Sequence, residues 1–494
     1  MCNIKPLPLQ GIAVMNKPTI KAPQFPTNEF SKRRDQLLTM IGENAIAIVP
    51  SALLKIRNRD AEFPFRQESD FLYLTNFNEP DAVAVFIPER KEGEYILFCR
   101  EKDAKMERWT GRMAGLEGAV ETYGADDAFP IEDIDDIVPG LMENRTSVHY
   151  SMGLDATFDQ QVMSWMSGLK GKIRSGIKAP HEFISLDLIL HDMRLYKSSA
   201  EHSFMRYAAK TAMASHQRAM KICKAGDYEY QLEAEILHEF RRKGMEPAYS
   251  SIVGGGENSC ILHYIENNAV LQDGDLVLID AGAEYQGYAS DITRTFPVNG
   301  KFSEPQRQLY QIVLDAQKAA IEKAKAGNTW NQPHEAAVRV IVAGLLEVGL
   351  LSGELESILE KEKKKEEKQV AEHKIKSRRA RHNDEQFKDE NAEDKKEEES
   401  YKQFFMHKTG HWLGLDVHDV GDYKVDDQWR LLEAGMVMTV EPGLYISPNK
   451  KVDEKWWNIG IRIEDDILIT VEGNEVLTQD LVKEVDDIER FMIK

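Results

Sequence analysis

The run from residue 276 to residue 295 places the strongest single constraint on how this chain folds. It reads Leu276-Val-Leu-Ile-Asp280-Ala-Gly-Ala-Glu-Tyr-Gln-Gly-Tyr-Ala-Ser-Asp291-Ile-Thr-Arg-Thr. An apolar, strand-like run ends on Asp280, and Asp291 begins a second run rich in β-branched residues. Carboxylates at the ends of buried strands are unfavourable unless a positive group neutralises them. A bound metal ion is the first candidate for that group.

Length and charge limit the class of protein. The 494 residues are too many for one typical core, so we expect two or more domains. The net charge of −20 argues against nucleic acid and anionic membranes as partners, because both require a basic surface. The apolar stretches are also too short to cross a bilayer.

The cysteines and the N-terminus suggest where the chain resides. The four cysteines are scattered without paired spacing, which suits a reducing compartment and gives no zinc signature. They are Cys2, Cys99, Cys223 and Cys260. Residues 1–25 are rich in proline and lack the apolar segment of a signal peptide. We therefore expect a poorly ordered tail over 1–25 and a cytoplasmic location.

The first half of the chain predicts a non-catalytic α/β domain over 26–192. Its first element is a helix over 29–41, with Asn28 as its cap. Strands are predicted at 45–50, 71–74, 82–87, 94–99 and 147–151, followed by amphipathic runs around 157–170.

The second half predicts an α+β domain over 195–494, with antiparallel strands flanked by pairs of helices. The expected helices cover 198–225, 228–243, 305–326 and 332–349. The expected strands cover 251–253, 276–280, 289–296, 437–441 and 461–470.

A mostly charged insertion at 360–402 interrupts this second domain. Its Lys/Arg and Asp/Glu residues are balanced, so the acidity of the chain belongs to the globular part. A solvated helical hairpin or a flexible loop is the preferred interpretation. A partner-binding or regulatory arm is the alternative.

Further metal-ligand candidates follow the insertion. Three histidines lie in Phe404-Phe-Met-His407-Lys-Thr-Gly-His411-Trp-Leu-Gly-Leu-Asp-Val-His418. The glycines argue against one helix face for His407 and His411. His411 and His418 have opposite strand parity, so a bend is needed to bring them into one site.

Two more carboxylates occur near the C-terminus. An apolar run ends on Glu441 before Pro-Gly, and Glu464 shares a strand face with Arg462. Taken singly, each candidate also has a structural interpretation as a turn residue, a core histidine or a plain ion pair. Taken together, four carboxylates and one imidazole balance two divalent cations, and such oxygen-rich sets favour metals such as Mn²⁺. The donors are Asp280, Asp291, His411, Glu441 and Glu464.

At these motifs the chain resembles the pita-bread metallopeptidases, and within them the bacterial aminopeptidase P and prolidase group. The resemblance extends over nearly all of residues 28–490 except the insertion. The motifs are Gly256-Glu-Asn-Ser-Cys-Ile-Leu-His263-Tyr, Ile279-Asp-Ala-Gly, Ser290-Asp-Ile-Thr-Arg-Thr, His411-Trp-Leu-Gly-Leu-Asp-Val-His418-Asp, Thr439-Val-Glu-Pro-Gly and Gly460-Ile-Arg-Ile-Glu-Asp. Phe65-Arg-Gln-Glu-Ser-Asp-Phe resembles the non-catalytic domain of the same group.

The resemblance implies a role for each site residue. Asp280 would bind one metal, Asp291 and Glu464 would bridge both, and His411 and Glu441 would complete the second site. His263 and His418 would contact substrate near the scissile bond, and His407 would line the pocket beyond it. Tyr445 and Arg462 would orient the ligands, and Trp109 would enter the active site of a neighbouring subunit. These residues imply two divalent ions sharing a bridging hydroxide, and a homo-oligomer, either a dimer or a tetramer.

The implied activity is removal of the first residue from peptides with proline second. Glu441 is the expected proton acceptor, and His418 is the expected donor to the oxyanion. A dipeptidase restricted to Xaa-Pro is the nearest alternative, and a metal-free binding protein of the same fold is a more distant one. Two departures from the group are Lys408, where glycine is usual, and Arg430, which is out of register with a substrate-side arginine.

Overall fold

The computed structural model describes residues 22–380 and 400–493. Residues 1–21 of the expected tail and 381–399 of the insertion lie outside the described residues. Phe25, the last residue of that tail, stacks on Phe204 with the ring centroids 4.2 Å apart. The packed part of the chain therefore begins before the first helix.

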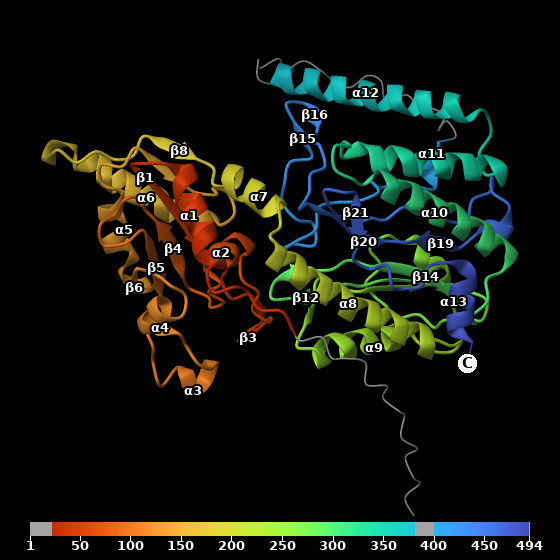
Figure 1. The fold of residues 1–494 in the computed structure, drawn as a ribbon, viewed down its shortest axis with the longest axis horizontal. Coiled ribbons are helices and arrows are strands. Elements are labelled where there is room, and N and C mark those ends of the chain that lie inside the picture. Colours follow the sequence, from red (N-terminus) through yellow and green to blue (C-terminus); the bar gives the residue numbers. More distant parts are fainter. Residues whose placement is uncertain (1–21, 381–399, 494) are drawn as a thin grey trace, which may run out of the picture.

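The N-terminal half is a six-stranded mixed sheet with helices on both faces (Figure 1). Alternate residues of the central strand point to opposite faces, since Ala47 and Val49 join one apolar cluster while Ile46 and Ile48 join another. In sheet order the strands are β6 (Asp127–Pro130), β5 (Tyr95–Cys99), β4 (Val83–Phe86), β1 (Ala45–Pro50), β7 (Ser147–His149) and β8 (Glu182–Ile184).

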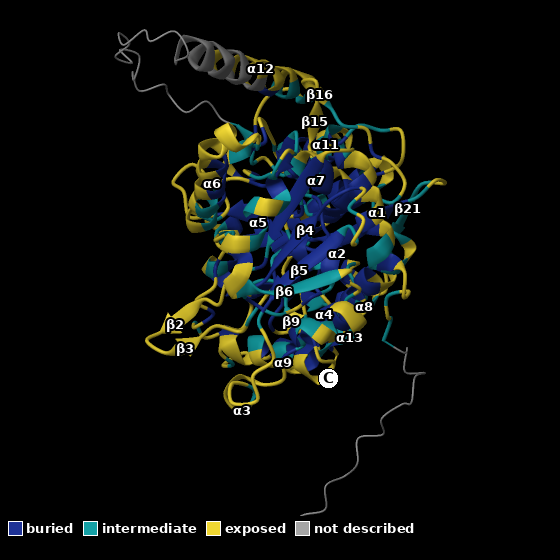
Figure 2. Cartoon of the chain, turned by 90° about the vertical axis from the view of Figure 1, so that its left-hand side faces the viewer, coloured by how far each residue is buried: buried dark blue, intermediate teal, exposed yellow. Residues whose placement is uncertain are grey.

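Helices and one small hairpin complete this half. The helices are α1 (Glu29–Ile41), α2 (Ser69–Thr75), α3 (Glu107–Thr110), α4 (Gly115–Glu121), α5 (Ile134–Met142), α6 (Ala156–Gly171) and α7 (Asp187–Leu195). The hairpin pairs β2 (Ile56–Asn58) with β3 (Ala61–Glu62). It projects from the lower edge of the molecule near α3, and both segments are largely exposed (Figure 2).

In the C-terminal half, short antiparallel sheets lie between two pairs of helices (Figure 1). The pairs are α8 (Ser199–Ile222) with α9 (Glu229–Arg242), and α10 (Glu304–Lys323) with α11 (Asn331–Glu347). The last two helices are α12 (Leu355–Ala380), which lies over α11, and α13 (Val485–Met492). None of the helices within the described ranges is long and apolar enough to span a membrane.

The strands of this half form four small sheets and one hairpin. One sheet contains β10 (Ile252–Gly255), β11 (Leu276–Asp280) and β14 (Thr293–Pro297), and the next contains β13 (Tyr288–Ala289), β12 (Ala283–Tyr285) and β9 (Glu246–Pro247). The others contain β17 (Val437–Val440), β20 (Asp465–Ile469) and β21 (Asn474–Val476), and β18 (Gly443–Ile446) with β19 (Ile459–Arg462). The hairpin pairs β15 (Lys424–Val425) with β16 (Gln428–Trp429).

Most predicted elements occur within a few residues of their expected bounds, but four expectations were wrong. Residues 71–74 belong to the helix α2, because Glu68 accepts a hydrogen bond from the Phe71 amide at 2.7 Å and caps its N-terminus. The expected strand over 289–296 is divided between β13 and β14. The expected strand over 461–470 is likewise divided between β19 and β20, which belong to different sheets, so Glu464 lies in the bend between them rather than on a strand face with Arg462. Asn28 makes no side-chain cap to α1, and its carbonyl instead accepts from the Ser31 hydroxyl.

Candidate metal centre

The break between β13 and β14 brings Asp291 beside Asp280. The amide of Ala281 donates to the carbonyl of Ile292 at 3.0 Å, which fixes the return of the chain after the break. Asp280 lies opposite Thr293 in the β11–β14 pair. The hydroxyl of Tyr249 lies within hydrogen-bond distance of both carboxylates and is 2.6 Å from Asp280 Oδ1.

Glu441 and Glu464 meet at one end of the β17–β20 pair. Val440 is paired with Asp465, so the residues just outside the pair, Glu441 and Glu464, lie at the same edge. The Thr293 hydroxyl donates to Glu464 Oε2 at 2.7 Å. Both glutamates therefore project into the space that Asp291 enters.

His411 completes the donor set. Its Nε2 lies 3.4 Å from Asp291 Oδ2 and 3.9 Å from Glu441 Oε1. Its Nδ1 lies 2.9 Å from the Trp412 carbonyl, a contact that places the proton on Nδ1 and turns the Nε2 lone pair toward the carboxylates. Donor atoms of Asp291, His411 and Glu464 all lie within 4.8 Å of one another.

The electrostatics of this group call for a cation. Burial, together with neighbouring carboxylates, raises the pKa of Asp291 and of Glu464 well above the usual range. Burial and the charge of Glu464 raise the pKa of Glu441 to about 8. Arg462 Nη2 donates to Asp280 Oδ2 at 2.6 Å and compensates part of the negative charge. Four hard carboxylates and one imidazole fit divalent metal ions.

A second layer of side chains supports the donors. Arg462 Nη1 also donates to the Tyr445 hydroxyl at 3.1 Å, and that hydroxyl lies 2.9 Å from His407 Nε2. His407 Nδ1 is 3.8 Å from Glu441 Oε2. Burial and the nearby Arg462 charge lower the pKa of His407 to about 4, so the ring is neutral at neutral pH.

The two remaining histidines lie at the open side of the centre. The rings of His418 and His411 meet edge to face with centroids 4.4 Å apart, so the required bend is present. Burial lowers the pKa of His418, and the charges of His411 and His263 lower it further. His263 is exposed and lies near enough that its charge lowers the pKa of both His407 and His418.

Trp109 and Arg430 lie away from the donors, whereas Lys408 lies in the loop between His407 and His411. Trp109 is 87% exposed on α3. Arg430 makes two hydrogen bonds to Asp192 Oδ1, at 3.0 and 2.7 Å, and so is held at the surface of α7. Lys408 lines a cavity of about 550 Å³ that also borders Thr409.

Sequence reasoning missed Tyr249 and Thr293. Thr293 follows Asp291 by two residues in the same motif, so strand parity could have identified it. Tyr249 follows β9 in a segment without a motif, and burial raises its pKa so that the hydroxyl remains a donor. Asp466 was also missed. It is buried and accepts a hydrogen bond from the Asp291 amide at 3.2 Å.

Comparison with known proteins agrees with this geometry. Residues 203–471 match the model of metallopeptidase family M24, and residues 30–150 match that of the aminopeptidase P N-terminal domain. The chain is 41% identical to the Xaa-Pro aminopeptidase of Escherichia coli strain K12, over 94% of this chain and 97% of that protein.

Solved structures are equally similar. Pseudomonas aeruginosa aminopeptidase PepP superposes with a TM-score of 0.86 at 49% identity, covering 95% of this chain and 98% of that one. A zinc-substituted E. coli aminopeptidase P in complex with product gives a TM-score of 0.85 at 40% identity, with the same coverage. The predicted architecture, an N-terminal α/β domain joined to a pita-bread domain, is confirmed. The chain belongs to metallopeptidase family M24 and carries the N-terminal domain of aminopeptidase P.

Proposed function

We propose that this protein is an Xaa-Pro aminopeptidase, a hydrolase that removes the first residue of peptides with proline in second place. The observation that carries the proposal is the convergence of Asp291, His411 and Glu464 within 4.8 Å, with Asp280 and Glu441 beside them. Relatives with this activity align over nearly the whole chain. Membership of family M24 implies divalent metal ions, and the oxygen-rich donors favour Mn²⁺.

A substrate with proline in second place sets a particular chemical demand. The bond before proline is a tertiary amide without an N–H. A peptidase that binds its substrate through the N–H of the scissile bond therefore cannot cleave this bond. When bound, two divalent ions would polarise the carbonyl and acidify a water molecule. The side chains of the site would transfer the protons of the reaction and orient the metal ligands and the substrate.

Each side chain has an assigned task under this proposal. Glu441, whose Oε1 lies 3.9 Å from His411 Nε2, accepts the proton of the attacking water as a carboxylate and delivers it to the proline nitrogen. His418 donates a hydrogen bond to the carbonyl oxygen as negative charge develops there. His263 contacts the substrate, and Arg462 fixes the orientation of Asp280.

We also propose a homo-oligomer in which Trp109 reaches the active site of a neighbouring copy. The support is its position on the projecting helix α3, where 87% of the residue is exposed (Figure 2). A large aromatic side chain gains most when it is buried at an interface.

Cleavage of two peptides tests the activity. The Mn²⁺-loaded protein should release arginine from Arg-Pro-Pro, and liquid chromatography would detect the product. Hydrolysis of Gly-Pro alone would instead identify an Xaa-Pro dipeptidase. A well-folded preparation that neither retains divalent metal nor responds to it would point to a binding protein.

Substitution of the expected proton acceptor tests the mechanism. Glu441→Gln should lower kcat by at least about 100-fold, because proton transfer of this kind contributes roughly 10²–10⁴-fold. Glu472→Gln is the matched control, since that glutamate is exposed in the turn between β20 and β21. Near-normal turnover by a correctly folded Glu441→Gln variant would exclude Glu441 as the acceptor.

A further inference from the structure

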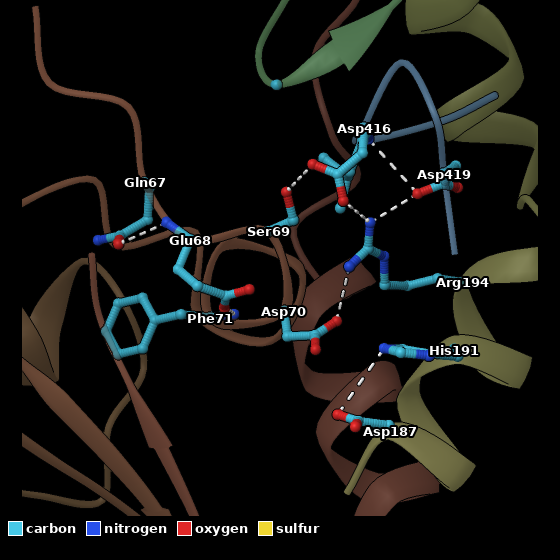
Figure 3. Close-up of polar contacts among 12 residues, drawn as sticks. Gln67, Glu68, Ser69, Asp70, Phe71, Asp187, His191, Arg194, Asp416 and Asp419 are labelled. Carbon is cyan, nitrogen blue, oxygen red and sulfur yellow. Dashed lines mark hydrogen bonds and ion pairs between the residues drawn. The ribbon is translucent and has the colours of Figure 1, made fainter. Parts of the chain in front are cut away.

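A cluster of charged side chains, buried except at its edge, where Asp416 is 41% exposed, connects the loop that carries His411 and His418 to the N-terminal half (Figure 3). Arg194 Nη1 donates to Asp70 Oδ1 at 2.8 Å. Arg194 Nη2 donates both to Asp416 Oδ2 and to Asp419 Oδ1, each at 2.6 Å. Lys197 Nζ donates to Asp419 Oδ2 at 2.9 Å. We refer to these five residues as the Arg194 cluster.

The members of the Arg194 cluster come from three parts of the fold. Asp70 lies on α2, Arg194 in the last turn of α7, and Asp416 and Asp419 on either side of His418. The Ser69 hydroxyl on α2 adds a second link, donating to Asp416 Oδ1 at 2.7 Å (Figure 3). One guanidinium thus joins the N-terminal half to both flanks of His418.

The burial of the cluster makes its pairing energetically important. The side chains of Arg194 and Asp419 are 3% and 1% exposed. Burial alone would raise the pKa of Asp419, but Lys197 and Arg194 lower it below the usual value, so the carboxylate is charged. Removing one partner of such a group leaves an uncompensated buried charge, and the surrounding chain must move to relieve it.

His411 and His418 are held by different contacts. The His411 amide donates to Thr439 Oγ1 at 3.1 Å, and the Thr439 amide donates to the His411 carbonyl at 2.9 Å, so β17 fixes His411. The backbone beside His418 is held by Asp419, whose side chain belongs to the Arg194 cluster and whose amide donates to the Trp412 carbonyl at 2.9 Å. Because β17 holds His411 from the other side, loss of the cluster should displace His418 more than His411.

We propose that Arg194 is a positioning residue for His418 and that Asp70 supplies the contribution of the N-terminal half. The N-terminal half thus contributes to turnover within its own chain by holding His418 in position. The inference rests on the proposed function, because the task of His418 belongs to it.

Conservative substitution of the arginine tests the proposal. Arg194→Lys keeps the charge but cannot contact three carboxylates through a planar fork. We expect kcat to fall roughly 10- to 100-fold, with KM and metal content close to those of the wild type. Asp70→Asn should also lower kcat, but by a smaller factor than Arg194→Lys. Metal analysis by mass spectrometry distinguishes this effect from loss of the His411 site.

Arg33→Lys provides the matched control. Arg33 is also buried between the two halves, donating to the Tyr73 carbonyl at 3.0 Å and lying 3.4 Å from Glu201 Oε2, but it does not belong to the Arg194 cluster. This variant should lower the melting temperature and leave kcat unchanged. An equal fall in kcat for Arg33→Lys would show that general loosening of the junction explains the effect, and would overturn the proposal.

A double-mutant cycle decides between positioning and a merely structural role. If Arg194 acts through His418, Arg194→Lys should cost little more in a His418→Ala background. If the fold-losses in kcat of the two single variants multiply in the double variant, the proposal is overturned. A wild-type kcat for folded Arg194→Lys would also overturn it. If Arg194→Lys does not fold, Asp70→Asn replaces it in the same cycle. A wild-type protein inactive on Arg-Pro-Pro would instead count against the proposed function.

Discussion

At the scale of single residues, the two aspartates have unequal surroundings. Asp291 lies 3.4 Å from His411 and within the same 4.8 Å group as Glu464, whereas Asp280 is held from one side by Arg462. We therefore predict that Asp291→Asn loses both metal ions and that Asp280→Asn chiefly loses one. Metal content per chain after dialysis, measured by plasma mass spectrometry, checks the stoichiometry.

Thermal unfolding of the same variants without metal provides the control for folding. Burial and Asp280 raise the pKa of Asp291, so its charged form destabilises the folded metal-free protein at neutral pH. Asp291→Asn should consequently raise the melting temperature of the metal-free protein. Retention of both ions by Asp291→Asn, or loss of both by Asp280→Asn, would contradict the assignment.

Single residues also show how far the sequence predicts the site. The five candidate donors stand out in the sequence because each follows or begins an apolar run, where an unpaired carboxylate or imidazole is unusual. Tyr249 could not be predicted, because it reaches Asp280 through the pairing of β9 with β12, a contact between distant segments. The same holds for Asp70 and Arg194, which are 124 residues apart.

At the scale of elements, local chemistry overrides periodicity. The apolar run at 71–74 resembles a strand, yet the Glu68 cap and the length of Ser69–Thr75 make it the helix α2. This difference has a functional consequence, because α2 carries Asp70 and Ser69 to the loop beside His418. The break at Ser290–Ile292 was likewise not visible in the sequence, because the β-branched residues that follow it predict one strand, although the break places Asp291 in the site.

The insertion gives a prediction at this scale. The start of α12 packs on the core through Ile358 and Leu359, and Glu362 Oε2 lies 3.5 Å from Lys402 Nζ. The two ends of the insertion are thus close together, so replacing residues 366–399 with a short glycine-serine linker should preserve the fold. We expect kcat and KM on Arg-Pro-Pro to match the wild type. A change of more than about tenfold in KM, equivalent to about 1.4 kcal/mol, would show that the insertion governs access.

At the scale of the whole molecule, the two halves share one apolar cluster. Phe71 and Leu74 of α2 join Phe204 of α8 and Leu413 of the His411–His418 loop in that cluster. Such packing makes the N-terminal half a fixed support for the site, consistent with the Arg194 cluster nearby. Sequence patterns indicate each half separately, but they do not indicate which apolar faces meet.

Assembly beyond one chain gives the last prediction, which concerns Trp109. Its exposure of 87%, with Met106 just before α3 exposed at 44%, leaves an apolar surface that a neighbouring copy would bury. Sedimentation velocity should therefore show an oligomer, and Trp109→Ala should have reduced activity. Mixing Trp109→Ala with Glu441→Gln should restore activity, because each variant supplies what the other lacks. In a mixed oligomer, the intact metal centre of the Trp109→Ala subunit would receive the tryptophan of the Glu441→Gln subunit. Mixed oligomers that do not recover activity would show that Trp109 lies outside the partner's site.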